Sequence, residues 1–583
     1  MATLFKEVSY NLATLIQQIE MGIIGLPDIQ RPFVWPDTKV RDLFDSMYKG
    51  YPVGYFLFWA NANVEHTKGI GTAVKQKHPN LLIVDGQQRL TSLFAVIKAQ
   101  EIIRENYTKA TIVIAFNPLE GKFEIPDASI RKNPRYFQNI SLIWQPNINI
   151  IKVINEFLQN LKKSVELTDQ EEENIQNAFM QLKNLESYPF SALELSTNIT
   201  EVQVADVFVR INSQGKTLNQ ADFILTLMSV FWEEGRKDLE EFCRLCRVPS
   251  KDSASPFNYL IDPDPDQMLR VSVGLAFRRA RLQYVYSILR GKDLETGQFS
   301  TERRDNQFEF LKTAQAKSLN IQNWHEFIKA VKQAGFARQD YISSKNNLLY
   351  AYIFFLIGRE DFKMDLYELK KLIGKWFFMS SITGRYTGSP ETVMEMDLAR
   401  LRGINTADEF KKVLDDIIVS QLTNDFWSIT LPMDLATSSS TSPSLYAYYA
   451  ALYVLGANGL FSKLKVSDLL QEGLRSKKSA LERHHLFPKA WLQRNGILEQ
   501  RETNQIANFA LVEWSDNISI SDTAPSEYLP FYLSRLTKEE KERMYYWHSL
   551  PENWEQMSYE DFLIERRKRI SLVVKDAYET ISN

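Results

Sequence analysis

The chain has 583 residues, more than the ~250–300 that one hydrophobic core can hold, so we expect two to four domains. With 44% hydrophobic residues, 24% charged residues and a net charge of −3, the composition excludes a largely disordered chain and a bulk polycation. Any contact with nucleic acid must therefore use locally clustered Lys and Arg side chains.

Three features indicate a cytoplasmic protein without a membrane partner. The N-terminus carries acidic residues and has no uninterrupted apolar stretch, so it does not resemble a signal peptide. The longest apolar run, at 348–357, is shorter than the ~20 residues of a membrane helix and predicts a buried core helix. The cysteines, Cys243 and Cys246, are too few for a disulfide-stapled protein and lack the four ligands of a zinc site, so we expect a buried, reduced pair.

Residues 1–230 alternate short apolar runs with helical patterns, as in an α/β domain. The runs at 52–59, 81–86 and 111–116 are rich in β-branched and aromatic residues and are bounded by Gly, Pro or Asn, which predicts strands. An acidic helix at 167–185 is expected on the surface of this domain.

A strand–turn–helix motif in this domain favours an anion site. The segment LLIVDGQQRLTSLF predicts a strand, a tight turn at Gly86 and a helix that starts near Arg89 or Leu90. The first turn of a helix offers free N–H groups and the positive end of the dipole to an anion. Arg89 can grip a phosphate, and Asp85 at the strand end can hold a metal ion or water. Alone, the Gly-x-x-Arg spacing is weak, because both residues occur near many turns.

Two flanking segments give this motif a family context. LPDIQRPFVWPDTKV begins at residue 26, and FVRINSQGKTLNQADF spans 208–223. Together with DGQQRLTSL they resemble the ParB/sulfiredoxin-like domain of GmrSD-type, modification-dependent (type IV) restriction endonucleases. The resemblance implies that the domain binds and hydrolyses a nucleoside triphosphate and regulates a nuclease domain. For Arg31 and Arg210, structural ion pairing stays an equal alternative, and Trp35 fits core packing better than base stacking. By this resemblance the candidate nucleotide-binding residues are Asp85, Gly86, Gln87, Gln88, Arg89, Gln30, Arg31, Arg210 and Asn212.

The middle of the chain, 231–436, is predicted to be a helical connector. Helical periodicity dominates, as at 366–379, while the alternating prolines of IDPDPDQ at 261–267 predict a loop. A Ser/Thr-rich linker at 437–444 then leads into the last domain, 445–583, which opens on a predicted helix.

The last domain contains two adjacent histidines, His484 and His485. The coarse pattern is an extended segment that ends at this pair, a helical excursion, a strand at 506–514, a turn, and a helix that begins near Ser526. Adjacent side chains of an extended segment point to opposite sides, so the two rings should have different roles. Phosphodiester hydrolysis requires a divalent ion and a base of near-neutral pKa, which histidine supplies.

The same segment, with Asn508 and with Asn517 before PSEYL, resembles the HNH (ββα-metal) nucleases. The resemblance implies that His485 is the general base, that His484 and Asn517 bind the metal, and that Asn508 braces the catalytic loop. A bare His-His pair would be an ordinary surface or core feature; the surrounding motif favours the nuclease. No Cys-x-x-Cys pair flanks the motif, so the structural zinc of some relatives is not expected.

Basic residues gather before the histidines. Between 461 and 489, seven Lys or Arg side chains stand against three Asp or Glu, a net charge of +4. Most charge runs are solvated helix faces, but we expect this one to contact DNA; for the second cluster, ERRKR at 565–569, both readings stay open. The candidate DNA-binding residues are Lys477, Lys478, Arg483 and Lys489.

The sequence thus predicts a multidomain α+β protein with an N-terminal ParB/sulfiredoxin-like α/β domain, a helical connector, and a C-terminal ββα-metal HNH domain surrounded by helices. The expected function is a nucleotide-regulated DNA endonuclease that requires Mg²⁺ or Mn²⁺ and acts in antiphage defence on foreign, modified double-stranded DNA. Two alternatives are a nickase that ignores nucleotides and a DNA-binding regulator with a degenerate nuclease domain. The sequence leaves open the preferred nucleotide, the DNA modification, nicking against double-strand cutting, and a homodimer.

Overall fold

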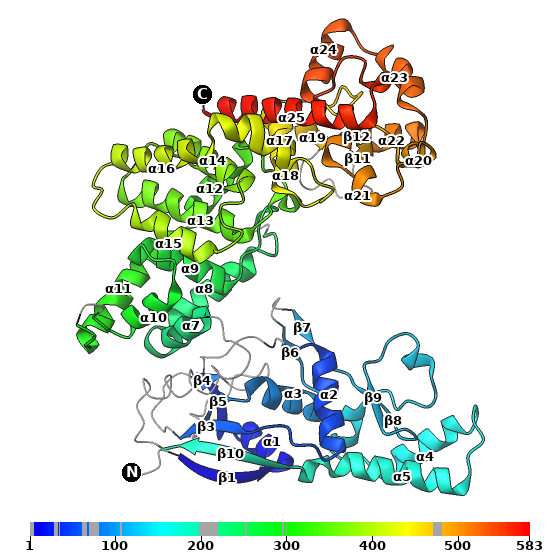
Figure 1. The fold of residues 1–583 in the computed structure, drawn as a ribbon. Helices are drawn as coiled ribbons and strands as arrows, with labels where there is room; N and C mark the ends of the chain where they lie inside the picture. The colour runs from blue at the N-terminus through cyan, green and yellow to red at the C-terminus, as the bar shows by residue number, and fades with distance from the viewer. Residues whose placement is uncertain are drawn as a thin grey trace. The chain divides into compact units, whose positions relative to one another are not determined.

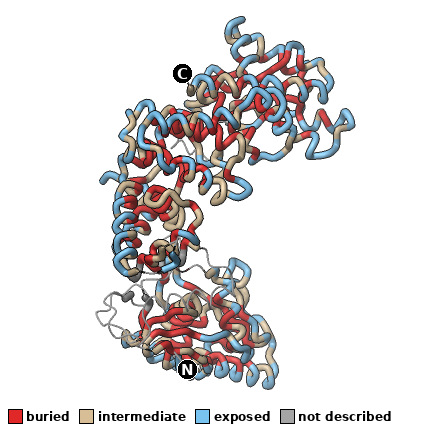
Figure 2. The backbone as a smooth tube through the Cα atoms, turned by 60° about the vertical axis from the view of Figure 1, so that its left-hand side comes forward, coloured by how far each residue is buried: buried red, intermediate tan, exposed pale blue. Residues whose placement is uncertain are grey.

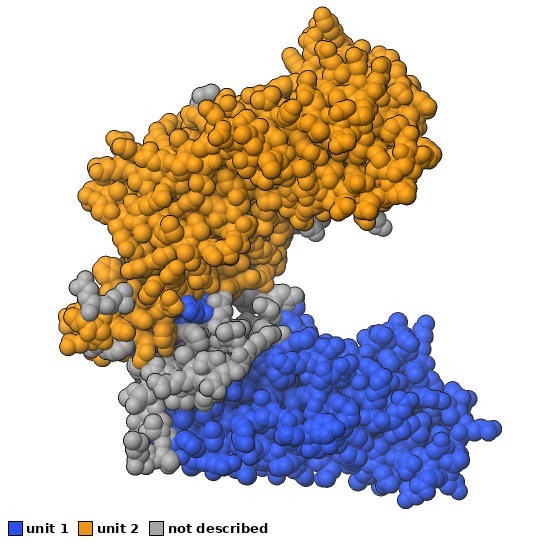
Figure 3. All heavy atoms as spheres, in the orientation of Figure 1, with its two compact units in different colours: residues 1–237 blue, residues 238–583 orange. Residues whose placement is uncertain are grey.

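The computed structural model describes residues 5–27, 33, 35–60, 67–68, 81–104, 108–196, 220–250, 253–293, 296–298, 300–469 and 481–582. The chain divides into two compact units, residues 1–237 and 238–583 (Figure 3). The finer division into three domains, at 1–230, 231–436 and 445–583, stays a prediction. Within unit 2, Tyr448 from the start of the third range donates a hydrogen bond to the Trp547 carbonyl at 2.8 Å.

Unit 1 is built on a mixed six-stranded sheet (Figure 1). Its order is β1-β10-β3-β5-β2-β4, with parallel pairs β10/β3 and β5/β2 and antiparallel pairs between the others. The sheet strands are β1 Phe5–Asn11, β2 Ile24–Pro27, β3 Phe56–Ala60, β4 Thr67–Lys68, β5 Leu81–Asp85 and β10 Pro189–Leu195. Two short hairpins are formed by β6 Ile102–Ile103 with β7 Lys109–Ala110 and by β8 Ala115–Asn117 with β9 Lys122–Glu124.

The central strands are apolar on both faces. On β3, Phe56 and Phe58 join the main core of unit 1, while Leu57 and Trp59 join a smaller cluster on the other face. This alternation follows from the two-residue period of a strand. The helices of this unit are α1 Leu12–Glu20, α2 Asp37–Tyr48, α3 Gln87–Lys98, α4 Ile150–Leu161, α5 Asp169–Lys183 and α7 Gln220–Phe231, and α8 Glu233–Leu245 spans the border between the units.

The bounds of two expected strands in unit 1 need correction. The strand expected at 52–59 begins at Phe56, because Gly54 has a φ of 88° and interrupts the extended backbone. The strand expected at 111–116 begins at Ala115, although buried residues precede it. The acidic helix expected on the surface of this domain is α5, and it packs one face, with the fully buried Ile175 and Phe179, against the core.

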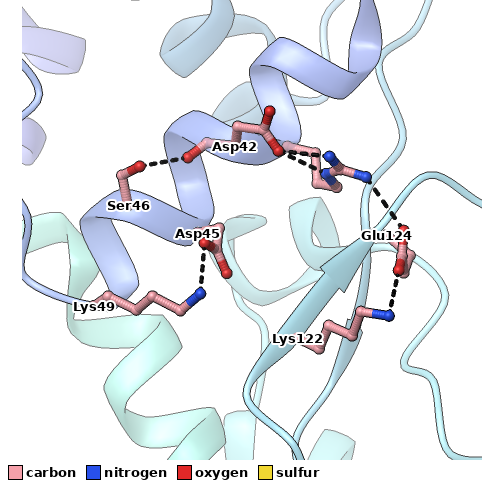
Figure 4. A network of polar contacts seen from close by, with 7 residues as sticks. Asp42, Asp45, Ser46, Lys49, Lys122 and Glu124 are labelled. Atoms are coloured by element: carbon pink, nitrogen blue, oxygen red, sulfur yellow. Dashed lines mark hydrogen bonds and ion pairs between the residues drawn. The ribbon is translucent and has the colours of Figure 1, made fainter.

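A polar network ties α2 to the β8–β9 hairpin (Figure 4). Nη1 of Arg41 on α2 donates to Oε2 of Glu124 on β9 at 3.3 Å, and Lys122 pairs with the same carboxylate at 2.7 Å. On the helix itself, Lys49 pairs with Asp45 at 2.8 Å. The contact of Arg41 with Glu124 thus joins the helix to the hairpin.

Unit 2 is mostly helical, with buried segments through its interior (Figure 2). The expected core helix is α13 Lys345–Leu356, buried from Asn347 to its end, and the expected helix at 366–379 is confirmed as α14 Leu366–Ile382. The predicted loop at 261–267 is wrong in its last three residues, because Asp264 caps the helix that starts at Pro265. The other helices before the histidines are α9 Pro265–Phe277, α10 Leu282–Leu289, α11 Thr301–Ser318, α12 Ile321–Gln333, α15 Pro390–Ala399, α16 Ala407–Gln421, α17 Leu431–Asp434, α18 Pro443–Val454 and α19 Val466–Leu469.

The remainder of unit 2 surrounds a two-stranded hairpin, β11 Leu481–His485 with β12 Phe509–Glu513 (Figure 1). Its helices are α20 Lys489–Arg494, α21 Gln500–Thr503, α22 Trp514–Ile520, α23 Pro525–Leu533, α24 Lys538–Trp547 and α25 Tyr559–Ser582. Cys243 and Cys246 are both buried and free, and burial raises the pKa of both thiols. None of the helices in the described part of the chain is long and apolar enough to span a bilayer.

Candidate active site

The two histidines end the first strand of an antiparallel hairpin that is followed by a helix. β11 pairs with β12 in a register that places His484 opposite Ala510 and His485 opposite Phe509. α22 follows β12 directly, so the ββα order is present, and the predicted turn after the second strand is wrong. The error has a local cause: α22 begins without a side-chain cap at Glu513 that the sequence could have signalled.

His484 faces the helix that follows the hairpin. Its ring is 3% exposed, and Nδ1 lies 2.9 Å from Oδ1 of Asn517 on α22. The Asn517 amide is itself oriented, because its Nδ2 donates to Oε2 of Glu482 at 2.7 Å. Burial lowers the pKa of His484 to about 4, so the ring is neutral at pH 7.

This network defines the tautomer of His484. Since Oδ1 of Asn517 accepts, Nδ1 carries the proton, and Nε2 keeps its lone pair. Nε2 is buried and has no hydrogen-bond partner among the described residues. The imidazole is therefore a neutral ligand with two nitrogens in different surroundings.

His485 points to the other side of the strand, as the alternation of side chains requires. Its Nε2 lies 3.0 Å from Oδ1 of Asn504, and its ring centroid lies 4.5 Å from that of Phe509. Burial lowers the pKa of this half-buried ring, with a smaller contribution from Lys489. With Nε2–H donated to Asn504, the lone pair on Nδ1 is the basic position, and the ring is neutral near pH 7.

Asn508 fixes the chain that follows the histidines. It is fully buried, accepts from the Phe487 N–H at 2.8 Å, and donates to the carbonyls of Phe487 at 3.0 Å and Thr503 at 3.2 Å. Three hydrogen bonds from one amide hold two separate segments together. These are the contacts of a brace, the role that the sequence suggests for this residue.

The geometry around His484 suits a divalent ion with octahedral coordination. Neighbouring ligands of an octahedral ion with bonds of about 2.1 Å lie about 3.0 Å apart, close to the 2.9 Å between Nδ1 of His484 and Oδ1 of Asn517. The described residues contain no cluster of three or more His, Cys, Asp or Glu side chains that could hold a metal. An ion between these two atoms would take Nδ1 and Oδ1 as ligands, with the ring proton moved to Nε2 and with waters and substrate phosphate completing the shell, as Mg²⁺ commonly does.

The sequence reasoning missed three residues of this site. Glu482 lies two residues before His484 and so shares its strand face, which is a signal that the spacing contained. Asn504 and Tyr528 gave no such signal, because their contacts depend on the fold of the helical excursion. The Tyr528 hydroxyl donates to the Leu486 carbonyl at 2.7 Å, and its ring packs edge-on against His484.

The candidate DNA-binding residues are described in part. Arg483 and Lys489 are exposed beside the histidines, with Nη1 of Arg483 donating to the Ser440 carbonyl at 3.4 Å. Lys477 and Lys478 lie outside the described residues. The first cluster thus presents at least two exposed cations next to the hairpin.

The second basic cluster, 565–569, is not a uniform DNA-facing surface. Arg566 is fully buried and donates to the carbonyls of His548 at 3.0 Å and Ala507 at 2.7 Å. Arg569 pairs with the glutamate one helical turn before it. We therefore assign Arg566 a structural role.

The candidate nucleotide site in unit 1 begins where β5 ends at Asp85. Gly86 follows with a φ of 93°, and a Cβ there would lie 2.5 Å from Cδ1 of Phe56, so the turn requires glycine. The helix α3 begins at Gln87, earlier than predicted, which places Gln88 in its first turn. Gln30, Arg31, Arg210 and Asn212 lie outside the described residues.

Arg89 is packed against the start of β3. Its Nη1 donates to the Tyr55 carbonyl at 2.9 Å, its guanidinium lies 5.4 Å from the centroid of the Phe56 ring, and burial lowers its pKa. A Cβ on Gly54 would lie 3.0 Å from Nη2. Arg89 thus joins the helix N-terminus to the neighbouring strand.

Comparison with known proteins identifies the N-terminal part. Residues 12–229 match the family model described as GmrSD restriction endonuclease, N-terminal domain. This stretch is therefore similar to the N-terminal domain of GmrSD restriction endonucleases, as its motifs predict. The uncharacterized protein MJ0686 of Methanocaldococcus jannaschii is similar to most of this chain. The two are 23% identical over 548 residues, which cover 89% of this chain and 86% of that protein.

Proposed function

We propose that this chain is a divalent-metal-dependent DNA endonuclease of the HNH kind. The observation that carries the proposal is the hairpin that presents His484 to Asn517 at 2.9 Å on one side and His485 to Asn504 at 3.0 Å on the other. Both imidazoles are neutral at pH 7, because burial lowers their pKa values. One ring is thereby suited to bind a metal ion and the other to accept a proton.

His485 would act as the general base. Its Nδ1 lone pair would take a proton from the attacking water while the hydrogen bond to Asn504 holds the ring in place. His484 and Asn517 would hold the ion, whose chemistry when bound is to stabilise charge on the scissile phosphate and the leaving oxygen. Asn508 keeps the loop after β11 in position, and Arg483 and Lys489 would contact the DNA backbone.

We further propose that unit 1 binds a nucleoside triphosphate and regulates cutting. The N-terminus of α3 carries the positive end of the helix dipole, which favours a phosphate, and Arg89 lies in the first turn of this helix. Asp85, Gly86, Gln87, Gln88 and Arg89 would form this site, with Gln30, Arg31, Arg210 and Asn212 as further candidates from the family resemblance. The ParB/sulfiredoxin-like fold of this unit is part of the same proposal.

The proposed substrate is foreign, modified double-stranded DNA, cut in the cytoplasm in antiphage defence of the type IV restriction kind. The support is the match of residues 12–229 to a restriction endonuclease family model. A second copy of the chain would be needed if each nuclease site cuts one strand.

A nuclease assay on the full chain tests these proposals together. Plain and modified phage DNA are incubated with EDTA, Mg²⁺ or Mn²⁺, each with and without nucleoside triphosphates. We expect cutting that requires the ion and changes with nucleotide. Cutting that ignores nucleotide would favour an unregulated nickase, and no cutting of any DNA would favour a DNA-binding regulator.

A further inference from the structure

Unit 1 contains a pocket outside the candidate nucleotide site. It has a volume of about 480 Å³ and lies between α4 and the segment from Arg131 to Leu142. Its size falls in the ~300–1,000 Å³ range of small-molecule sites. None of the residues Asp85 to Arg89 lines it.

Gln138, one of the residues that line this pocket, holds its amide in a fixed orientation. Nε2 of Gln138 donates to the carbonyls of Ile130 at 3.1 Å and Tyr136 at 3.0 Å, which sets the orientation of the amide. Oε1 of Gln138 is consequently left buried without a hydrogen-bond partner among the described residues. Because an unpaired buried acceptor is costly, a ligand that brings an N–H or O–H group would be favoured here.

The rest of the pocket lining is mainly apolar and includes two cations. Leu142 and Ile148 are large apolar side chains that are 47% and 37% exposed along the lining. Arg131 and Lys132 are exposed and have no acidic partner in the described part of the chain. The one carboxylate in the lining, Glu156, is within 3.9 Å of the Lys152 ammonium.

We propose that this pocket binds a single nucleotide, with the base inside and its donor edge on Oε1 of Gln138, and with the phosphate at Arg131 and Lys132. A nucleobase combines a flat apolar body with ring N–H or amino donors, and its sugar carries the anionic group that the two cations require. A free mononucleotide and a nucleotide turned out of a DNA strand share this chemistry. The proposal does not rest on the HNH site, which belongs to unit 2.

Two binding measurements on the full chain in EDTA test the pocket. Isothermal titration with each of the four deoxynucleoside monophosphates measures free nucleotides. A duplex that contains 2-aminopurine reports an extruded base by a rise in fluorescence. EDTA prevents metal-dependent cutting, so failure of the nuclease proposal would leave both readouts unchanged.

Three variants are measured beside the parent protein: two of them change the pocket, and one is the control. Arg131→Ala should weaken binding about tenfold or more, since it removes a charged contact to phosphate. The matched control is Arg135→Ala, which removes an exposed arginine four residues later that does not line the pocket, and should leave binding within about twofold. Leu142→Trp should fill the pocket and abolish binding, with circular dichroism to verify the fold.

Either source of nucleotide supports the proposal if the response is lost in Leu142→Trp and retained in Arg135→Ala. Monophosphate binding identifies a free nucleotide as a ligand, and a 2-aminopurine signal identifies a base of the DNA. The proposal is overturned if neither probe responds. It is equally overturned if Arg131→Ala and Arg135→Ala weaken binding alike, because the effect is then general surface charge.

Discussion

The two candidate sites of this protein differ in how their residues are brought together. The site around His484 lies within a single stretch, from Glu482 to Tyr528, and the contacts of His484 come from one hairpin and the two helices that follow it. The candidate nucleotide site, as the family resemblance implies it, would combine the β5–α3 turn with residues more than fifty positions before and more than a hundred positions after it, which lie outside the described residues. A site made from one stretch can be recognised from its own geometry, whereas one made from distant segments needs a family comparison.

The support for the two sites differs accordingly. Residues 12–229 match a family model, so unit 1 is identified by comparison. The hairpin in unit 2 is supported by distances and burial. Substitutions that weaken one site at a time show whether the other site still functions.

The largest effect is expected for His485→Ala. Loss of the general base should slow DNA cutting by about 10²–10⁴-fold and leave DNA binding intact. Single-turnover cleavage and a mobility-shift assay measure the two quantities. His325→Ala is the control. That ring lies 2.7 Å from the Ser255 carbonyl and is not part of the hairpin. Cutting at the parent rate by His485→Ala would contradict the assignment.

Asn517→Ala should come next. It removes an oxygen ligand and the partner of His484, so Mn²⁺ affinity and cutting should both fall by about 10–100-fold. Glu482→Gln should cost less, because a glutamine can still accept from the Asn517 amide. Electron paramagnetic resonance of bound Mn²⁺ measures affinity without DNA. Asn495→Ala, which removes an exposed amide bonded to the Trp491 carbonyl, is the control and should change neither quantity.

Arg89→Ala tests the other site. It should weaken triphosphate binding about tenfold and remove the effect of nucleotide on cutting, while cutting without nucleotide continues. Because Arg89 also donates to the Tyr55 carbonyl, a thermal melt must accompany the titration. Arg89→Lys keeps the charge and should be intermediate. Unchanged triphosphate turnover in the alanine variant would remove Arg89 from the site.

The smallest effect concerns the pH profile. Burial lowers the pKa of His485, so the parent should lose kcat/KM as the pH falls through a value below 6.5 and be on its plateau at pH 7. Asn504→Asp places a carboxylate beside Nε2, which favours the protonated ring and raises its pKa. Cutting should then be slower near pH 6 and nearly unchanged at pH 8. An unshifted profile would show that this ring is not the base.

The sequence predicted those parts of the fold that depend on local patterns. The helices α13 and α14 and the strand that ends at His485 follow from periodicity or from a motif. The order of the sheet in unit 1 does not, because β1 pairs with β10, whose residues lie 178 to 190 positions later in the chain. Periodicity indicates that a strand exists but not which strand it joins.

The candidate site shows the same limit. The motif located His484, His485, Asn508 and Asn517, but the role of Asn504 depends on how the helical excursion returns to the hairpin. α22 was missed because WSDNISI has neither a capping residue before it nor a strong apolar face. Polar residues that become neighbours only when the chain folds cannot be recognised from their spacing in the sequence.

A crystal of the protein soaked in Mn²⁺, with anomalous diffraction data, tests the central claim most directly. We predict an anomalous peak about 2.1 Å from both the His484 imidazole and Oδ1 of Asn517. The same peak should be absent from Asn517→Ala crystals. A parent crystal that binds Mn²⁺ elsewhere, or that has no peak beside these two residues, would contradict the account.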